Sequence, residues 1–135
     1  MNRRGGFTLI ELMIVVIILA ALAGMVLPRL LNRADTAKSY IAEADIASIT
    51  TALNLYKLDN GSYPSSSEGG LKALLQPPKS ARNGKEPYLD KVALDPWKRP
   101  YKYKYPGSHN PIGFDLWSTG VDIGNAEDDI TNWGK

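Results

Sequence analysis

The stretch "RRGGFTLIELMIVVIILAALAGMVLP", residues 3–28, decides the fold because it reads as one long apolar helix. From Phe7 to Pro28 its only ionisable side chain is that of Glu11. At about 1.5 Å per residue such a helix spans roughly 33 Å, enough to cross the hydrocarbon core of a bilayer. A carboxylate there costs on the order of 2.5 kcal/mol or more, so we interpret Glu11 as a functional residue.

The remaining chain of roughly 100 residues has a common domain size. Its composition excludes several kinds of site and partner. The absence of cysteine excludes a disulfide framework and a Cys-ligated metal. Arg3 and Arg4 account for the excess of 16 basic over 14 acidic residues. The rest is balanced and has no concentrated basic face, so we expect no nucleic-acid partner.

Two simpler interpretations of the N-terminal stretch are a secretory signal peptide and a plain membrane anchor. The apolar run exceeds the usual signal core of about 7 to 15 residues, and it ends at Pro28 and Arg29 without a small-residue cleavage site. A plain anchor explains the length and the arginines. It leaves Glu11 without a role beyond snorkelling to the headgroups.

The segment "GGFTLIE", residues 5–11, resembles the N-terminal motif of type IV pilins and type II secretion pseudopilins. The resemblance implies that a prepilin peptidase cuts between Gly6 and Phe7 and that Phe7 is then N-methylated. In a helical filament, the Glu11 carboxylate of one subunit would neutralise the Phe7 amine of its neighbour. Two buried charges that are costly alone become tolerable as a pair, and the pair would fix the axial register.

The apolar helix is expected to continue well beyond Pro28. Proline removes one helical hydrogen bond, and the resemblance implies that the stem helix bends or melts here during packing; a helix end is the alternative. Farther along, apolar residues recur at spacings of 4, 3, 4 and 3: Ala42, Ile46, Ile49, Leu53 and Tyr56. We therefore predict one long helix that ends near Asn60 and Gly61.

A period of two predicts strands in the second half of the chain. In "YKYKY", residues 101–105, three tyrosines alternate with two lysines, so the tyrosines should face the helix and the lysines water. A platform for single-stranded nucleic acid is the alternative. Segment 114–120 predicts a second strand, 88–92 a short piece nearby, and 70–75 a short helix. Ser65 and Glu68 have capping-box spacing before that helix.

Together these elements predict an α+β, type IV pilin-like fold. Its long N-terminal stem helix would cross the membrane with its first half, and its second half would pack on a small antiparallel sheet. The order of segments resembles that of the major pseudopilins of type II secretion more than that of fibre-forming type IV pilins, many of which close with a cysteine pair. One departure is "DPWKRPY", residues 95–101, where the family usually has Gly and Asn after the Trp. A second is a shorter C-terminal loop.

That loop, "STGVDIGNAEDDI" at residues 118–130, gathers carboxylates and glycines. Clustered carboxylates and carbonyls suit a hard cation such as Ca²⁺, although the EF-hand spacing is absent and a solvated acidic loop is the alternative. The resemblance implies a calcium site with the side chains of Asp122, Asp128 and Asp129. Carbonyls near Thr119 and Ala126 would complete it.

No catalytic motif is present: His109, the only histidine, lies beside Ser108 in a turn-rich segment, so we expect no enzyme. The resemblance implies a leader at 1–6, a transmembrane and assembly half of the helix at 7–31, and a periplasmic globular domain at 32–135. Arg3 and Arg4 favour a cytoplasmic leader, although Arg29 and Arg33 lie on the far side.

The implied function is that of a single-pass inner-membrane subunit that assembles into a periplasmic filament. With minor pseudopilins, an inner-membrane assembly platform and a cytoplasmic ATPase, this filament would drive folded proteins through an outer-membrane secretin. A type IV pilin for adhesion or motility is the alternative. A membrane-anchored periplasmic binding or enzymatic domain would be a different class, and it would need no cleavage after Gly6.

Overall fold

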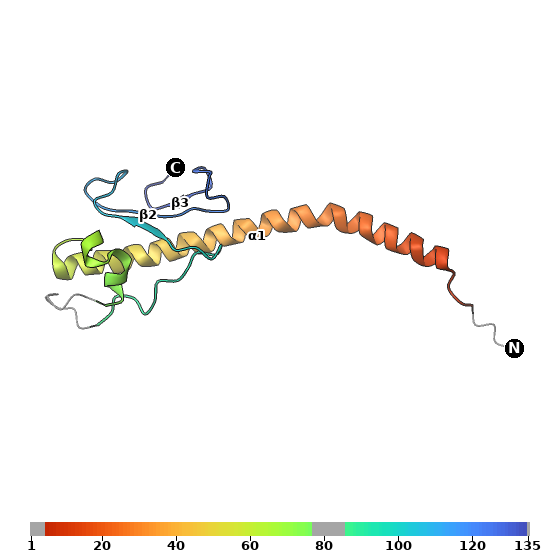
Figure 1. Ribbon diagram of the computed structural model, residues 1–135, viewed down its shortest axis with the longest axis horizontal. Helices are drawn as coiled ribbons and strands as arrows, with labels where there is room; N and C mark the ends of the chain where they lie inside the picture. The colour runs from red at the N-terminus through yellow and green to blue at the C-terminus, as the bar shows by residue number, and fades with distance from the viewer. Residues whose placement is uncertain (1–4, 77–85, 135) are drawn as a thin grey trace. The chain divides into compact units, whose positions relative to one another are not determined.

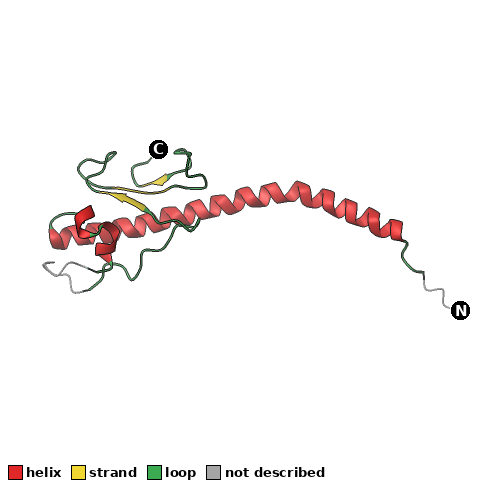
Figure 2. Cartoon of the chain, in the orientation of Figure 1, coloured by secondary structure: helices red, strands yellow, loops and turns green. Residues whose placement is uncertain are grey.

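The computed structural model describes residues 5–76 and 86–134. The elements are helix α1 (Leu9–Asn60), the 3₁₀ helices η1 (Ser66–Glu68) and η2 (Gly70–Leu74), and strands β1 (Lys102–Lys104), β2 (Asp115–Ser118) and β3 (Ile130–Thr131), as Figures 1 and 2 show. The chain divides into two compact units, Met1–Thr36 and Ala37–Lys135.

Helix α1 runs through Pro28 without a break, so the alternative of a helix end at this proline is wrong. Residues 5–34 are all exposed in the isolated chain. The helix contains a segment that is long and apolar enough to cross a membrane, and none of that segment is buried. Exposed apolar surface of this extent marks a site of lipid or protein contact.

The second half of α1 supplies one side of the hydrophobic core, as its sequence pattern predicts. All five residues of the predicted stripe are buried, each with at most 5% of its surface exposed. They pack with residues of η2 and with residues in or directly before strands β1 and β2: Ala73, Leu74, Tyr101, Phe114 and Leu116. Each large apolar side chain buried here contributes about 1.5 to 3 kcal/mol to folding.

The sheet is antiparallel with the order β1-β2-β3. β1 and β2 fall within the two strands predicted at 101–105 and 114–120, whereas β3 was not foreseen because two residues carry no periodic signal. The prediction of a strand-like piece at 88–92 is wrong. The backbone N–H groups of Tyr88 and Leu89 both donate to the Leu74 carbonyl, which holds that segment on η2 rather than on the sheet.

Two tyrosines of the first predicted strand, Tyr101 and Tyr103, form hydrogen bonds with different parts of the domain. The Tyr101 hydroxyl donates to Asp45 Oδ2 on α1 at 2.7 Å, so this ring packs on the helix as predicted. The Tyr103 hydroxyl donates instead to the Pro64 carbonyl at 2.9 Å. Burial raises the pKa of both Tyr101 and Tyr103 well above the ordinary value. Lys102 and Lys104 are exposed, as predicted.

Candidate functional site

The Glu11 carboxylate already has partners at the start of its own helix. Its Oε2 accepts hydrogen bonds from the Thr8 backbone N–H at 2.9 Å and from the Thr8 hydroxyl at 2.8 Å. The Glu11 N–H lies 3.3 Å from Thr8 Oγ1, which completes a reciprocal capping box. Sequence reasoning missed this role, although the "TLIE" spacing signals it.

The capping box changes the physical account of Glu11. In the isolated chain the carboxylate satisfies the backbone N–H of Thr8, which precedes the helix and has no partner within it. It also lies at the end of the helix where the macrodipole favours negative charge. The Glu11 carboxylate is therefore held beside Thr8 at the start of α1.

The second candidate site, the loop 119–129, begins at a buried network that follows β2. The Ser118 hydroxyl donates to Asp95 Oδ2 at 2.7 Å, and Gly120 N–H donates to Ser118 Oγ at 3.2 Å. Asp95 Oδ1 accepts from the N–H groups of Trp97 and Arg99 at 3.0 and 2.8 Å. This network fixes the first residues of the loop to the turn 95–99.

Lys98 and Arg99, the predicted departure in this turn, both have structural consequences. Lys98 adopts a φ of 69°, a left-handed conformation that costs a non-glycine residue about 1 to 2 kcal/mol. The Arg99 guanidinium donates to the Gly120 carbonyl. The substitution of the usual Gly and Asn is thus accommodated by a strained backbone, and Arg99 adds a contact to the loop.

Gly120 joins the two ends of the loop. Its φ is +60°, and a Cβ at this position would lie 2.0 Å from the Asp128 carbonyl oxygen. Only glycine lets the backbones of the 119–120 segment and Asp128 approach this closely. Of the predicted calcium residues, Thr119 and Asp128 are therefore on segments that meet.

Inside the loop, side chains form local turns. Asp122 Oδ1 accepts from Gly124 N–H at 3.0 Å, and Asn125 Oδ1 accepts from Glu127 N–H at 3.1 Å. The Ala126 carbonyl accepts from Asp129 N–H at 3.4 Å. One oxygen of Asp122 and the carbonyl of Ala126 are thus engaged within the loop.

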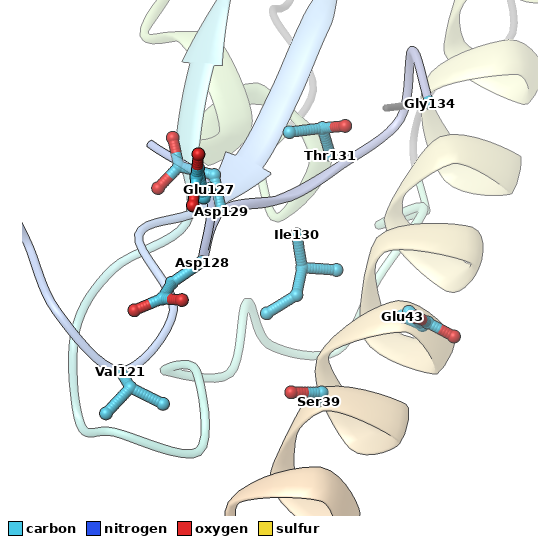
Figure 3. A pocket seen from close by; sticks show the side chains of 9 residues that line it. All are labelled: Ser39, Glu43, Val121, Glu127, Asp128, Asp129, Ile130, Thr131 and Gly134. Carbon is cyan, nitrogen blue, oxygen red and sulfur yellow. The ribbon is translucent and has the colours of Figure 1, made fainter. Parts of the chain in front are cut away.

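A cavity of about 420 Å³ lies between the end of this loop and α1. Figure 3 shows Glu127, Asp128 and Asp129 on its loop side and Ser39 and Glu43 on α1, with the Asp128 carboxylate apart from the other two. Asp122 does not line it. Within residues 5–76 and 86–134, no group of three or more His, Cys, Asp or Glu side chains is placed to hold a metal ion. The donor atoms suit Ca²⁺ in kind but do not converge on one point.

Sequence reasoning also missed Asp115, the buried residue that organises the turn 107–113. Its carboxylate accepts from the N–H groups of Ser108, His109 and Asn110 at 2.7 to 3.0 Å. His109 Nδ1 lies 3.1 Å from the same carboxylate, and the His109 ring stacks on Trp133 at 4.2 Å. Ser108 and His109 thus hold a turn in place. In the sequence, the available signal for this role was an aspartate close after a turn-rich segment.

Asp115→Asn is expected to lower the free energy of unfolding by about 2 kcal/mol at pH 7, because an amide offers one acceptor oxygen where the carboxylate offers two. Burial raises the pKa of Asp115, but hydrogen bonds from His109, Ser108 and Asn110 outweigh it and hold the pKa below 3.8. This stabilisation is therefore present above pH 3.8 and lost as the pH falls through the lowered value.

Chemical denaturation at pH 7 and at pH values below 3.8 measures this effect. The gap between Asp115→Asn and the unchanged chain should narrow at acid pH. The matched control is Asp90→Asn, since Asp90 is exposed. If both variants lost the same stability at pH 7, the three backbone hydrogen bonds would not be the cause.

Comparisons with known proteins all point to one protein family. Residues 29–133 match the family model of type II secretion system (T2SS) protein G, and residues 1–27 match the prokaryotic N-terminal methylation motif. Type II secretion system core protein G of Pseudomonas aeruginosa is 46% identical, with 98% of this chain and 96% of that protein covered. The Escherichia coli K12 protein of the same name is 40% identical, with 98% and 93% covered.

The fold is also found among solved structures. The crystal structure of the major pseudopilin from the type 2 secretion system of enterohaemorrhagic Escherichia coli matches with a TM-score of 0.63 and 31% identity. The match covers 78% of this chain and 95% of that chain.

Proposed function

Because this chain belongs to the type II secretion protein G family and is a major pseudopilin, a structural subunit of the secretion pseudopilus, we propose that its filament drives folded proteins through an outer-membrane secretin. The family is structural and not enzymatic. The observation that most supports the proposal is that the methylation motif, residues 1–27, runs into the apolar first part of α1, whose surface is exposed in the isolated chain.

The apolar helix is consistent with anchorage in the inner membrane. In our proposal, residues 1–6 are a leader, residues 7–31 form the membrane and assembly half of the stem, and residues 32–135 form a periplasmic domain. Pro28 would let the stem adjust where subunits pack. The partners would be a prepilin peptidase, minor pseudopilins and an assembly platform with a cytoplasmic ATPase.

Deleting the gene tests the transport function against the type IV pilin alternative. Loss of the pseudopilus should leave secreted proteins folded in the periplasm while surface pili remain. Loss of surface pili with normal secretion would contradict our proposal. Re-expression of the chain from a plasmid should restore secretion and serves as the control.

Processing gives a direct prediction: the mature chain should begin with N-methyl-Phe7. The motif that spans Gly6 and Phe7 supports this site. Intact mass spectrometry of the membrane-extracted protein should show loss of residues 1–6 and the addition of one methyl group. A chain that retains Arg3 and Arg4 in cells with active peptidase would contradict the prediction.

We further propose that the loop 119–129 binds Ca²⁺. The side chains of Asp122, Asp128 and Asp129 and the carbonyls of Thr119 and Ala126 would hold the ion. Bound calcium would neutralise carboxylates that otherwise repel one another. The contact of Gly120 with Asp128 supports this proposal, because it already brings the two ends of the loop together.

Calcium is therefore expected to raise the melting temperature of the purified chain relative to chelator. A ligand that binds only the folded state adds about 2.7 kcal/mol at a hundredfold excess over its Kd. The fluorescence of Trp117 and Trp133, whose rings lie 5.7 Å apart, reports unfolding in this region. Asp122→Ala should abolish the difference and Asp90→Ala should keep it. Equal melting temperatures in calcium and chelator would leave an ordinary solvated acidic loop.

A further inference from the structure

A groove of about 650 Å³ lies between η2 and β1. Its lining is mainly apolar and includes Leu71, Leu75, Val92, Leu94 and Tyr101. Leu94 is 55% exposed although it lies in a folded domain with a hydrophobic core. Among the described residues β1 pairs only with β2, so it lies at an edge of the sheet. An exposed apolar surface of this kind commonly marks an interaction site.

Lysines surround this groove. Lys72 and Lys102 line it directly, while Lys91 and Lys98 line an adjoining hollow that also contains Leu94. All four are exposed. We call the apolar lining together with these lysines the lysine-rimmed groove. Its occupant should combine an apolar contact surface with negative charge.

The same chain carries a segment with that chemistry. Val121 and Ile123, at the start of the acidic loop, are 50% and 72% exposed. Asp122 lies between them, and three further carboxylates follow within six residues of Ile123. We call residues 121–123 the acidic tip. The tip follows Gly120, whose carbonyl accepts a hydrogen bond from Arg99, so it begins beside the turn 95–99, next to Leu94 of the groove.

We propose that the acidic tip of one subunit docks into the lysine-rimmed groove of a second copy of this chain. Ile123 would contact Leu94 and Leu71, and the carboxylates of the loop would face the lysines of the rim. Two different surfaces joined in this way form a heterologous contact. Such a contact repeats from subunit to subunit into an open helical assembly, unless the rotation between subunits closes it into a ring. The inference uses the filament assembly of the family and shares the carboxylates of Asp122, Asp128 and Asp129 with the proposed metal site. The contact is therefore tested through Ile123 and Leu94, neither of which is a proposed ligand.

Cross-linking of introduced cysteines tests the contact. The chain has no cysteine of its own, so no native thiol of this chain competes in the reaction. Full-length Leu94→Cys and Ile123→Cys chains are co-expressed in cells that process and assemble the pseudopilus, and a short bismaleimide is added at constant calcium. Only a bond between two copies can join these singly substituted chains. We expect a cross-linked dimer from the mixture and none from either variant alone. Leu71→Cys in place of Leu94→Cys provides a second position in the groove.

The matched control is Ile112→Cys, because Ile112 is 91% exposed and lies on a different turn. It should not cross-link to Leu94→Cys although its thiol is more accessible than that at position 123. Lys72→Glu with Lys102→Glu should reduce the 94–123 band to the level of this control. The contact is refuted if assembled filaments lack the 94–123 band, or if the control pair gives an equal one. Anionic lipid is the alternative occupant of the groove. The contact is therefore also refuted if the thiol of Leu94→Cys in filaments is protected from maleimide only when anionic lipid is present.

Discussion

Glu11→Ala is expected to abolish filament assembly while the chain remains in the membrane. Removing a charge from an apolar helix does not oppose insertion. In the assembled state, the amine of a neighbouring Phe7 would be buried without a partner, which costs about 3 to 5 kcal/mol. Such a loss lowers the association constant by at least about a hundredfold. Sedimentation of sheared filaments and fractionation of membranes measure the two effects separately.

The capping box of Thr8 and Glu11 supplies two control variants. Glu11→Gln keeps a side chain that can complete the box but removes the charge. Thr8→Ala removes the box, at a cost of about 1 kcal/mol, but keeps the charge. Pairing with the amine predicts failure of Glu11→Gln and assembly of Thr8→Ala. The opposite pattern would show that Glu11 acts only by starting the helix.

The second large effect is expected for Gly120→Ala. Its left-handed φ costs alanine about 1 to 2 kcal/mol, and the new methyl group would collide with the Asp128 carbonyl. Forced overpacking adds about 1 to 3 kcal/mol. At roughly 4 to 8 °C per kcal/mol for a domain of this size, the melting temperature should fall by more than about 10 °C.

Gly124→Ala is the matched control in the same loop. A Cβ at Gly124 has Asp122 Oδ1 as its nearest neighbour at 3.7 Å, an ordinary contact. Its effect should stay within about 0.5 kcal/mol. Thermal melts followed by tryptophan fluorescence compare the two variants. If Gly120→Ala and Gly124→Ala had the same melting temperature, the close approach of the two loop ends would not matter for stability.

Long periodic segments made most of the fold predictable. The stripe from Ala42 to Tyr56 repeats over several turns, and each of its members is buried. β3 could not be found in this way, because two residues are too few to show the alternation by which a strand is recognised. The segment 88–92 was wrongly assigned to the sheet, since its backbone bonds are made with Leu74, a contact that periodicity does not encode.

The candidate sites were predictable in residue type more than in arrangement. The position of Glu11 follows from its motif, while its bonds to Thr8 follow from local helix chemistry that the spacing also signals. The Arg99 contact with Gly120 joins segments 21 residues apart and has no sequence pattern. For the same reason the direction of each acidic side chain in loop 119–129 was not foreseeable.

The buried stripe of α1 also has a mechanical meaning for a pseudopilus subunit, because the proposed transport function would load the filament along its axis. From Ala42 to Tyr56 the stripe extends about 21 Å along the helix axis, at about 1.5 Å per residue. A load applied along this axis shears all of these contacts in parallel, together with the Tyr101 to Asp45 hydrogen bond. The sheet can therefore travel with its segment of the helix without sliding, whereas a pull perpendicular to the axis would separate the same contacts one after another.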